Sequence, residues 1–143
     1  CPRGGGDVAP GRAALQCVCV PGTPPFSIRQ AEAEAIGFLL TVTEPVKPSA
    51  SDPDNFGVSQ FRYTYHPEYG SPRFNHAGQK DSQTPIEVTD AALSANRLEL
   101  RLTLSGWMEG HVTQVRCFDV ISEAGKALWH DTFHYTLNDI PKP

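Results

Sequence analysis

Short stretches of alternating apolar and polar residues run through most of this chain. The clearest is RLELRLTL at 97–104, where leucines fall on one side and charged or threonine residues on the other. A period of two places successive side chains on opposite faces of a strand, so the stretch predicts a half-buried β-strand. GFLLTVTEPV at 37–46 alternates in the same way until Pro45. Such patterns are typical of antiparallel sheets with one solvated face.

Five further segments have strand-like composition and are separated by Gly, Pro, Asn or Asp. They are LQCVCV at 15–20, FGVSQFRYTY at 56–65, IEVTDAAL at 86–93, HVTQVRCFDV at 111–120 and FHYTLNDIP at 133–141. RQAEAEA at 29–35 stays ambiguous, because it contains helix formers but its Glu/Ala alternation also fits an edge strand. About seven short strands and no convincing amphipathic helix predict an all-β fold.

The expected architecture is an immunoglobulin-like β-sandwich, because two half-buried sheets must cover each other. A small β-barrel is the alternative. A length of 143 residues suits one domain. Residues 1–14, rich in Gly, Pro and Ala, predict a flexible N-terminal arm, and residues 15–143 are expected to form the sandwich.

Composition narrows the function classes. The hydrophobic fraction of 39% with only 20% charged residues indicates a folded chain. The formal net charge of −4 gives no basis for nucleic-acid binding. No apolar stretch approaches the length of a membrane span.

The chain has four cysteines, Cys1, Cys17, Cys19 and Cys117. An even count permits two disulfides. Cys17 and Cys19 lie two residues apart on one face of the expected strand, which suits a bond between them poorly. We therefore expect one of them to pair with Cys117 and the other with Cys1, which indicates an oxidising, extracytoplasmic location. A zinc site is the competing interpretation, but CVC lacks the usual CxxC spacing.

The segment YTYHPEYGSP at 63–72 gathers aromatic residues before a turn. These rings either line the sheet and anchor the turn or form a sugar-binding surface, since aromatic rings stack on the apolar face of a pyranose. The ligand-binding candidates are Tyr63, Tyr65, His66, Tyr69 and Trp107. Trp129 is expected to be buried, because Leu128 and Phe133 flank it.

Catalytic chemistry has little support in the sequence. The acidic residues fall in separate turns, and no nucleophile, phosphate-binding or dinucleotide motif occurs. The possible copper or zinc ligands are His66, His76, His111, His130 and His134. Only His130 and His134 have a His-x₃-His spacing, and an expected strand break separates them. We expect no enzyme, no cofactor and no metal, with these two histidines as weak metal candidates.

Four phrases resemble one recurring domain of large secreted bacterial proteins. They are LQCVCVPGTPPFSI, FRYTYHPEYGSP, LSGWMEGHVTQVRC and GKALWHDTFHYTLNDIP. The resemblance is to an immunoglobulin-like C-terminal domain of proteins that also carry a sugar-dehydrogenase-like β-propeller and often a c-type cytochrome domain. The relatives carry a basic residue and an aromatic where this chain has Cys17 and Cys19, and the chain has no CxxCH haem motif. The resemblance implies an extracytoplasmic sandwich without catalysis of its own.

Together these features predict a secreted or periplasmic, non-catalytic accessory module that binds polysaccharide through an aromatic surface. The alternative is an interaction or spacer domain that docks redox domains of a larger protein. A small histidine-liganded metalloprotein is the second alternative.

Overall fold

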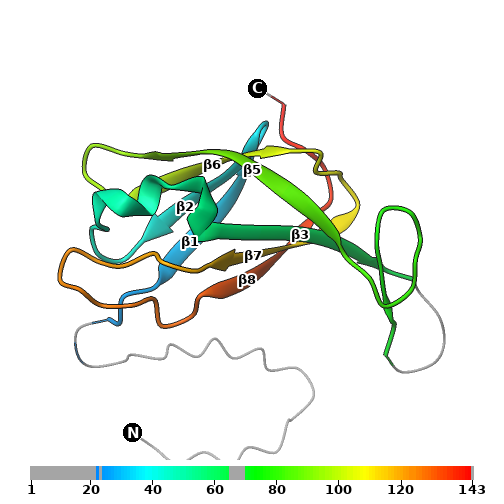
Figure 1. Cartoon of the computed structure of the whole chain (residues 1–143), viewed down its shortest axis with the longest axis horizontal. Helices are drawn as coiled ribbons and strands as arrows, with labels where there is room; N and C mark the ends of the chain where they lie inside the picture. The colour runs from blue at the N-terminus through cyan, green and yellow to red at the C-terminus, as the bar shows by residue number, and fades with distance from the viewer. Residues whose placement is uncertain (1–21, 23, 65–69, 143) are drawn as a thin grey trace, which may run out of the picture.

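The computed structural model describes residues 22, 24–64 and 70–142 of the chain. These residues form an all-β fold, as the alternation predicts (Figure 1). The strands are β1 Ile28–Glu34, β2 Gly37–Val42, β3 Phe56–Tyr63, β4 Arg73–Phe74, β5 Thr84–Leu93, β6 Glu99–Ser105, β7 His111–Cys117 and β8 Thr132–Leu137. Two short 3₁₀ helices, η1 Pro48–Ser51 and η2 Pro53–Asn55, precede β3.

The strands pair antiparallel in the order β1-β2-β6-β5-β3-β7-β8, and β4 pairs with β3. Strand β5 connects the two halves of this order. Its start pairs with β3 through Val58 and Ile86, and from Glu87 onward it pairs with β6, with a register shift between Val88 and Asp90. A bulge bends a strand and increases its twist. The sheet therefore folds over at β5 and nearly closes, which fits both the β-sandwich and the small barrel expected from the sequence.

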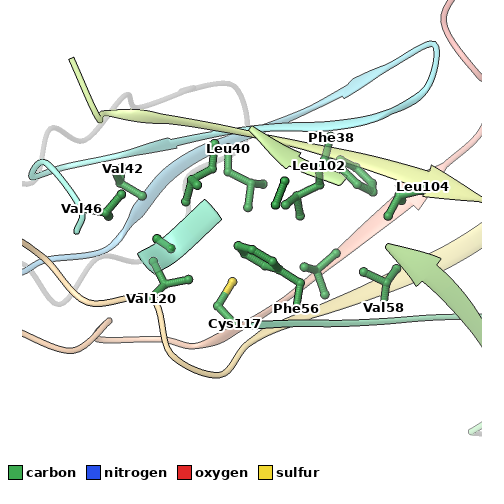
Figure 2. Packing of buried hydrophobic residues seen from close by; sticks show 14 of the residues in the cluster. Phe38, Leu40, Val42, Val46, Phe56, Val58, Leu102, Leu104, Cys117 and Val120 are labelled. Atoms are coloured by element: carbon green, nitrogen blue, oxygen red, sulfur yellow. The ribbon is translucent and has the colours of Figure 1, made fainter. Parts of the chain in front are cut away.

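Side chains from both halves of the sheet fill one core (Figure 2). Leu100, Leu102 and Leu104 of β6 are buried, as the alternation in 97–104 predicts. Phe38 of β2 joins the halves, because its fully buried ring contacts Tyr135 of β8 edge to face at a centroid distance of 5.1 Å. Edge-to-face aromatic pairs stabilise a core beyond the apolar area that they bury.

The ambiguous segment 29–35 resolves as an edge strand, since β1 pairs only with β2 among the described residues. One face of this strand is turned toward the core, where Ala31 and Ala33 pack against buried residues. No helix in the described part of the chain is long and apolar enough to cross a membrane. The expected N-terminal arm and the expected strand at 15–20 lie outside the described residues.

Candidate functional site

The predicted aromatic surface is described only in part, because Tyr65, His66 and Tyr69 lie outside the described residues. Tyr63 ends β3 with half of its side chain exposed. Its ring packs edge-on against Phe61, at 5.3 Å between centroids. Phe61 is itself covered on the outer face of β3, where the Arg73 guanidinium lies 4.4 Å from its ring centroid. Tyr63 is thus available to solvent at the edge of a small outer cluster.

Trp107 lies elsewhere. It is partly buried against the core, and its ring contacts Phe38 edge to face at 5.4 Å. Phe38 belongs to the interior between the layers, whereas the partner of Tyr63 lies on the outer face of β3. The structure therefore does not bring Trp107 and Tyr63 onto one surface.

Trp129 is 70% exposed, so its predicted burial is wrong. It lies in the connection between β7 and β8. No strand period determines the direction of a side chain there, so the path of the backbone sets it. The backbone N–H of Trp129 donates to the Phe26 carbonyl at 2.9 Å, which fixes the backbone and leaves the indole ring exposed. Phe118, which follows β7 directly, is also exposed, at 60%. Sequence reasoning missed both rings as surface groups.

Phe118 and Trp129 border a groove of about 430 Å³, here called the aromatic groove. Its lining is Cys117, Phe118, Ala127, Leu128, Trp129, His130, Asp131 and Thr132. Backbone hydrogen bonds hold its two sides together, because the Cys117 N–H donates to the Asp131 carbonyl at 2.7 Å. The groove is at the end of the molecule formed by the β7–β8 connection, drawn in orange in Figure 1.

The Phe118 ring is positioned by the absence of a side chain beneath it. A Cβ on Gly57 of β3 would lie 2.9 Å from two ring carbons of Phe118, so the ring packs directly on the glycine. The Arg116 guanidinium lies 5.4 Å from the same ring centroid, within cation–π range. The Phe118 N–H also donates to the Asn55 carbonyl at 2.8 Å. These contacts keep an exposed aromatic face in a defined place.

Polar groups accompany the two rings. His130, Asp131 and Thr132 line the groove, and the Thr132 hydroxyl donates to Asp131 Oδ1 at 2.8 Å. Aromatic faces with a few fixed hydrogen-bonding groups suit a ligand that has an apolar side and a polar rim. Neither His130 nor His134 belongs to a group of three or more potential metal ligands among the described residues. The aromatic groove thus offers binding chemistry rather than an assembled metal site.

Cys117 lies under the groove with a buried side chain. It is the single cysteine within the described residues, so its disulfide with Cys17 or Cys19 stays a prediction. Burial, followed by the charge of Asp131, raises the pKa of the Cys117 thiol to about 12. Because the thiolate is the nucleophilic form, we expect the reduced side chain to be chemically inert in the folded domain.

This inertness can be measured in a variant with Cys1, Cys17 and Cys19 replaced by serine. At about pH 8, Cys117 is expected to resist alkylation in the native protein and to react readily in denaturant, where its pKa returns to about 8.5. Because the folded pKa is raised, the thiol's contribution to stability is complete below the unfolded pKa. It is lost as pH rises toward the folded value of about 12. Labelling of the native protein as fast as that of the unfolded chain would contradict the assignment.

No family model matches the chain, and no curated protein matches it. Solved structures of a bacterial surface-layer protein share its fold. The N-terminal part of the bacterial S-layer protein SbsC aligns with a TM-score of 0.57 and 19% identity over 80% of this chain and 24% of that chain. The S-layer protein rSbsC(31–844) aligns with a TM-score of 0.56 and 19% identity, over 80% of this chain and 14% of the other. This chain therefore spans about a quarter or less of the proteins that it resembles.

Proposed function

We propose that this chain is a non-catalytic, extracellular domain of a bacterial surface or secreted protein, and that it binds polysaccharide through the aromatic groove. The observation that carries the proposal is the 70% exposure of Trp129 beside polar groove residues. Exposed apolar surface rimmed by polar residues is typical of a binding site, and here the exposed rings of Trp129 and Phe118 border one groove with polar residues. A pyranose ring fits both parts of the groove, since its C–H face stacks on an aromatic ring and its hydroxyls reach polar groups.

The likeness to surface-layer structures supports the extracellular, non-catalytic part of this proposal. The oxidising location expected from the cysteines agrees with it. Because the match covers most of this chain but a minor share of the other proteins, it also suits one domain among several in a longer polypeptide.

Replacing Trp129 with alanine tests the polysaccharide proposal. In affinity gels containing a β-1,4-glucan, a xylan or chitin, the native domain should be retarded by at least one polymer. Trp129→Ala should weaken that binding about tenfold, since a stacked aromatic ring contributes on the order of 1–2 kcal/mol. An exposed side chain contributes little to folding, so thermal unfolding should change little.

Two matched variants complete this test. Met108→Ala removes another exposed apolar side chain, outside the groove, and should leave binding unchanged. Tyr63→Ala examines the surface predicted from the sequence, and a loss confined to this variant would move the site to β3. Equal retardation of the native domain and Trp129→Ala would refute binding through the groove.

A docking domain is the second candidate function, and the small share of the surface-layer proteins covered by this chain favours it. In this case Phe118 and Trp129 would contact a neighbouring domain of the same polypeptide. No polymer would then retard the domain, and indole fluorescence of Trp129 would shift to shorter wavelength in a chain extended through its adjoining domains. The redox neighbours implied by the sequence resemblance are one form of this candidate.

A further inference from the structure

The β4–β5 loop and the start of β7 lie at the end of the molecule opposite the β7–β8 connection, which borders the aromatic groove (Figure 1). A cluster of hydrogen-bonded polar side chains joins the loop to β7. The Gln60 amide is its centre and has no exposed surface. Gln60 Nε2 donates to the Met108 carbonyl at 3.0 Å and to Thr113 Oγ1 at 2.9 Å. Gln60 Oε1 accepts from the Met108 N–H at 2.8 Å. These contacts determine which end of the amide is the oxygen.

The orientation of Gln60 determines the tautomer of His76. His76 Nε2 lies 3.1 Å from Gln60 Oε1. An amide oxygen can only accept, so Nε2 must carry the proton and donate it. The lone pair of the neutral ring is therefore on His76 Nδ1, for which the described residues provide no hydrogen-bond partner.

The second histidine of the cluster, His111, is fixed in the opposite tautomer. Its Nδ1 lies 2.9 Å from the Glu109 carbonyl oxygen. A carbonyl also can only accept, so Nδ1 carries the proton and the lone pair is on Nε2. His111 is buried at the start of β7, which limits the movement of its ring.

The two imidazole rings are neighbours, with centroids 4.6 Å apart and planes inclined at 62°. The loop that carries His76 is held by its own hydrogen bonds: the His76 N–H donates to Thr84 Oγ1, and the Asn75 side chain contacts Gln79. Burial, followed by the proximity of His111, lowers the pKa of His76.

We propose that His76 and His111 bind one borderline divalent transition-metal ion, Zn²⁺ or Cu²⁺, through His76 Nδ1 and His111 Nε2. Each ring donates its other N–H to a protein oxygen, which is the outer-shell arrangement that orients metal-ligating histidines. Neutral imidazole prefers zinc and copper to the hard cations Ca²⁺ and Mg²⁺. Among the described residues no group of three or more metal-ligating side chains forms, so water or an external ligand completes the coordination.

Metal binding here would join the β4–β5 loop to β7 and stabilise that end of the domain. Whatever binds the native state alone stabilises it by mass action. This inference is independent of the polysaccharide proposal, because it concerns different residues at the other end of the molecule.

The test uses the full-length chain with Cys1, Cys17 and Cys19 replaced by serine, so that thiols do not bind the metal. Calorimetric titration should show one Zn²⁺ site, no binding of Ca²⁺, and tighter binding of Cu²⁺ than of Zn²⁺. His76→Gln or His111→Gln should weaken Zn²⁺ binding at least tenfold. His134→Gln, which removes an exposed histidine of β8, should leave it unchanged.

A spectroscopic measurement makes the test independent of variant folding. Long-range ¹H–¹⁵N spectra of the metal-free protein should place the ring protons on His76 Nε2 and His111 Nδ1. Zn²⁺ should then shift the other two ring nitrogens, His76 Nδ1 and His111 Nε2. Shifts confined to His130 or His134, or equal Zn²⁺ affinity in all three variants, would overturn the proposal, as would the absence of binding.

Discussion

Replacing Gly37 with alanine is expected to unfold the domain or to cost at least about 4 kcal/mol of folding free energy. Gly37 opens β2, and a Cβ built there would lie 1.9 Å from the Leu102 carbonyl oxygen of the adjacent strand β6. The obstacle is backbone within a hydrogen-bonded ladder, so it cannot rotate away as a side-chain end could. The Leu104 N–H, which donates to the Ile36 carbonyl at 2.8 Å, is also 3.3 Å from the added carbon. Relief of the clash requires separation of β2 from β6.

Circular dichroism with thermal and denaturant unfolding measures this effect. Gly106→Ala is the matched control, because Gly106 has a φ of +81° but nothing within 4 Å of an added Cβ. That variant carries backbone strain alone and should lose about 1–2 kcal/mol. Similar losses in the two variants would mean that the close approach of β6 to Gly37 is not a constraint on the fold.

Replacing Gln60 with leucine should cost about 3 kcal/mol of folding free energy. Leucine has a similar size and fits a buried position, but it leaves the N–H and carbonyl of Met108 without their partner. Each buried polar group that loses its hydrogen bond costs about 1–3 kcal/mol. The bond to His76 disappears as well, so hydrogen exchange in the β4–β5 loop should become faster.

Gln30→Leu makes the same chemical change at an exposed position of the edge strand β1 and should stay within about 0.5 kcal/mol of the native stability. Thr113→Val removes one partner of the same network. Because Gln60 and Thr113 are hydrogen-bonded to each other, the double variant should lose less than the sum of the two single losses. Strict additivity, or a neutral Gln60→Leu, would show that the amide does not organise this end of the domain.

Several of these features could be read from local sequence. The leucines of 97–104 share one face because strand geometry requires it, and Leu100, Leu102 and Leu104 are buried as predicted, with Leu98 partly buried against the core. The same rule could have identified Phe118 as an outward residue, since Cys117 before it faces the core. Gln60 broke the apolar pattern of β3, and a polar residue at an inward position is a signal of a buried network.

Other features had no local signal. Trp129 follows no strand period, and its exposure depends on how the β7–β8 connection leaves the core. The segment 29–35 forms a strand because the backbone of β2 provides hydrogen-bonding partners along its edge. His76 and His111 are far apart in sequence, and their contact depends on a loop folded back onto the end of the sheet.

The sequence alone determined that the domain is built of strands and which side of the regular strands is apolar, because both follow from a two-residue period and from turn residues. The tertiary structure decided how those strands pair, where the sheet folds over at β5, and which polar and aromatic side chains meet at its two ends. The physical reason is that pairing and burial are properties of contacts between distant segments. The local pattern predicts on which face of its own strand a side chain lies. The residues that it contacts on that face come from distant segments of the chain.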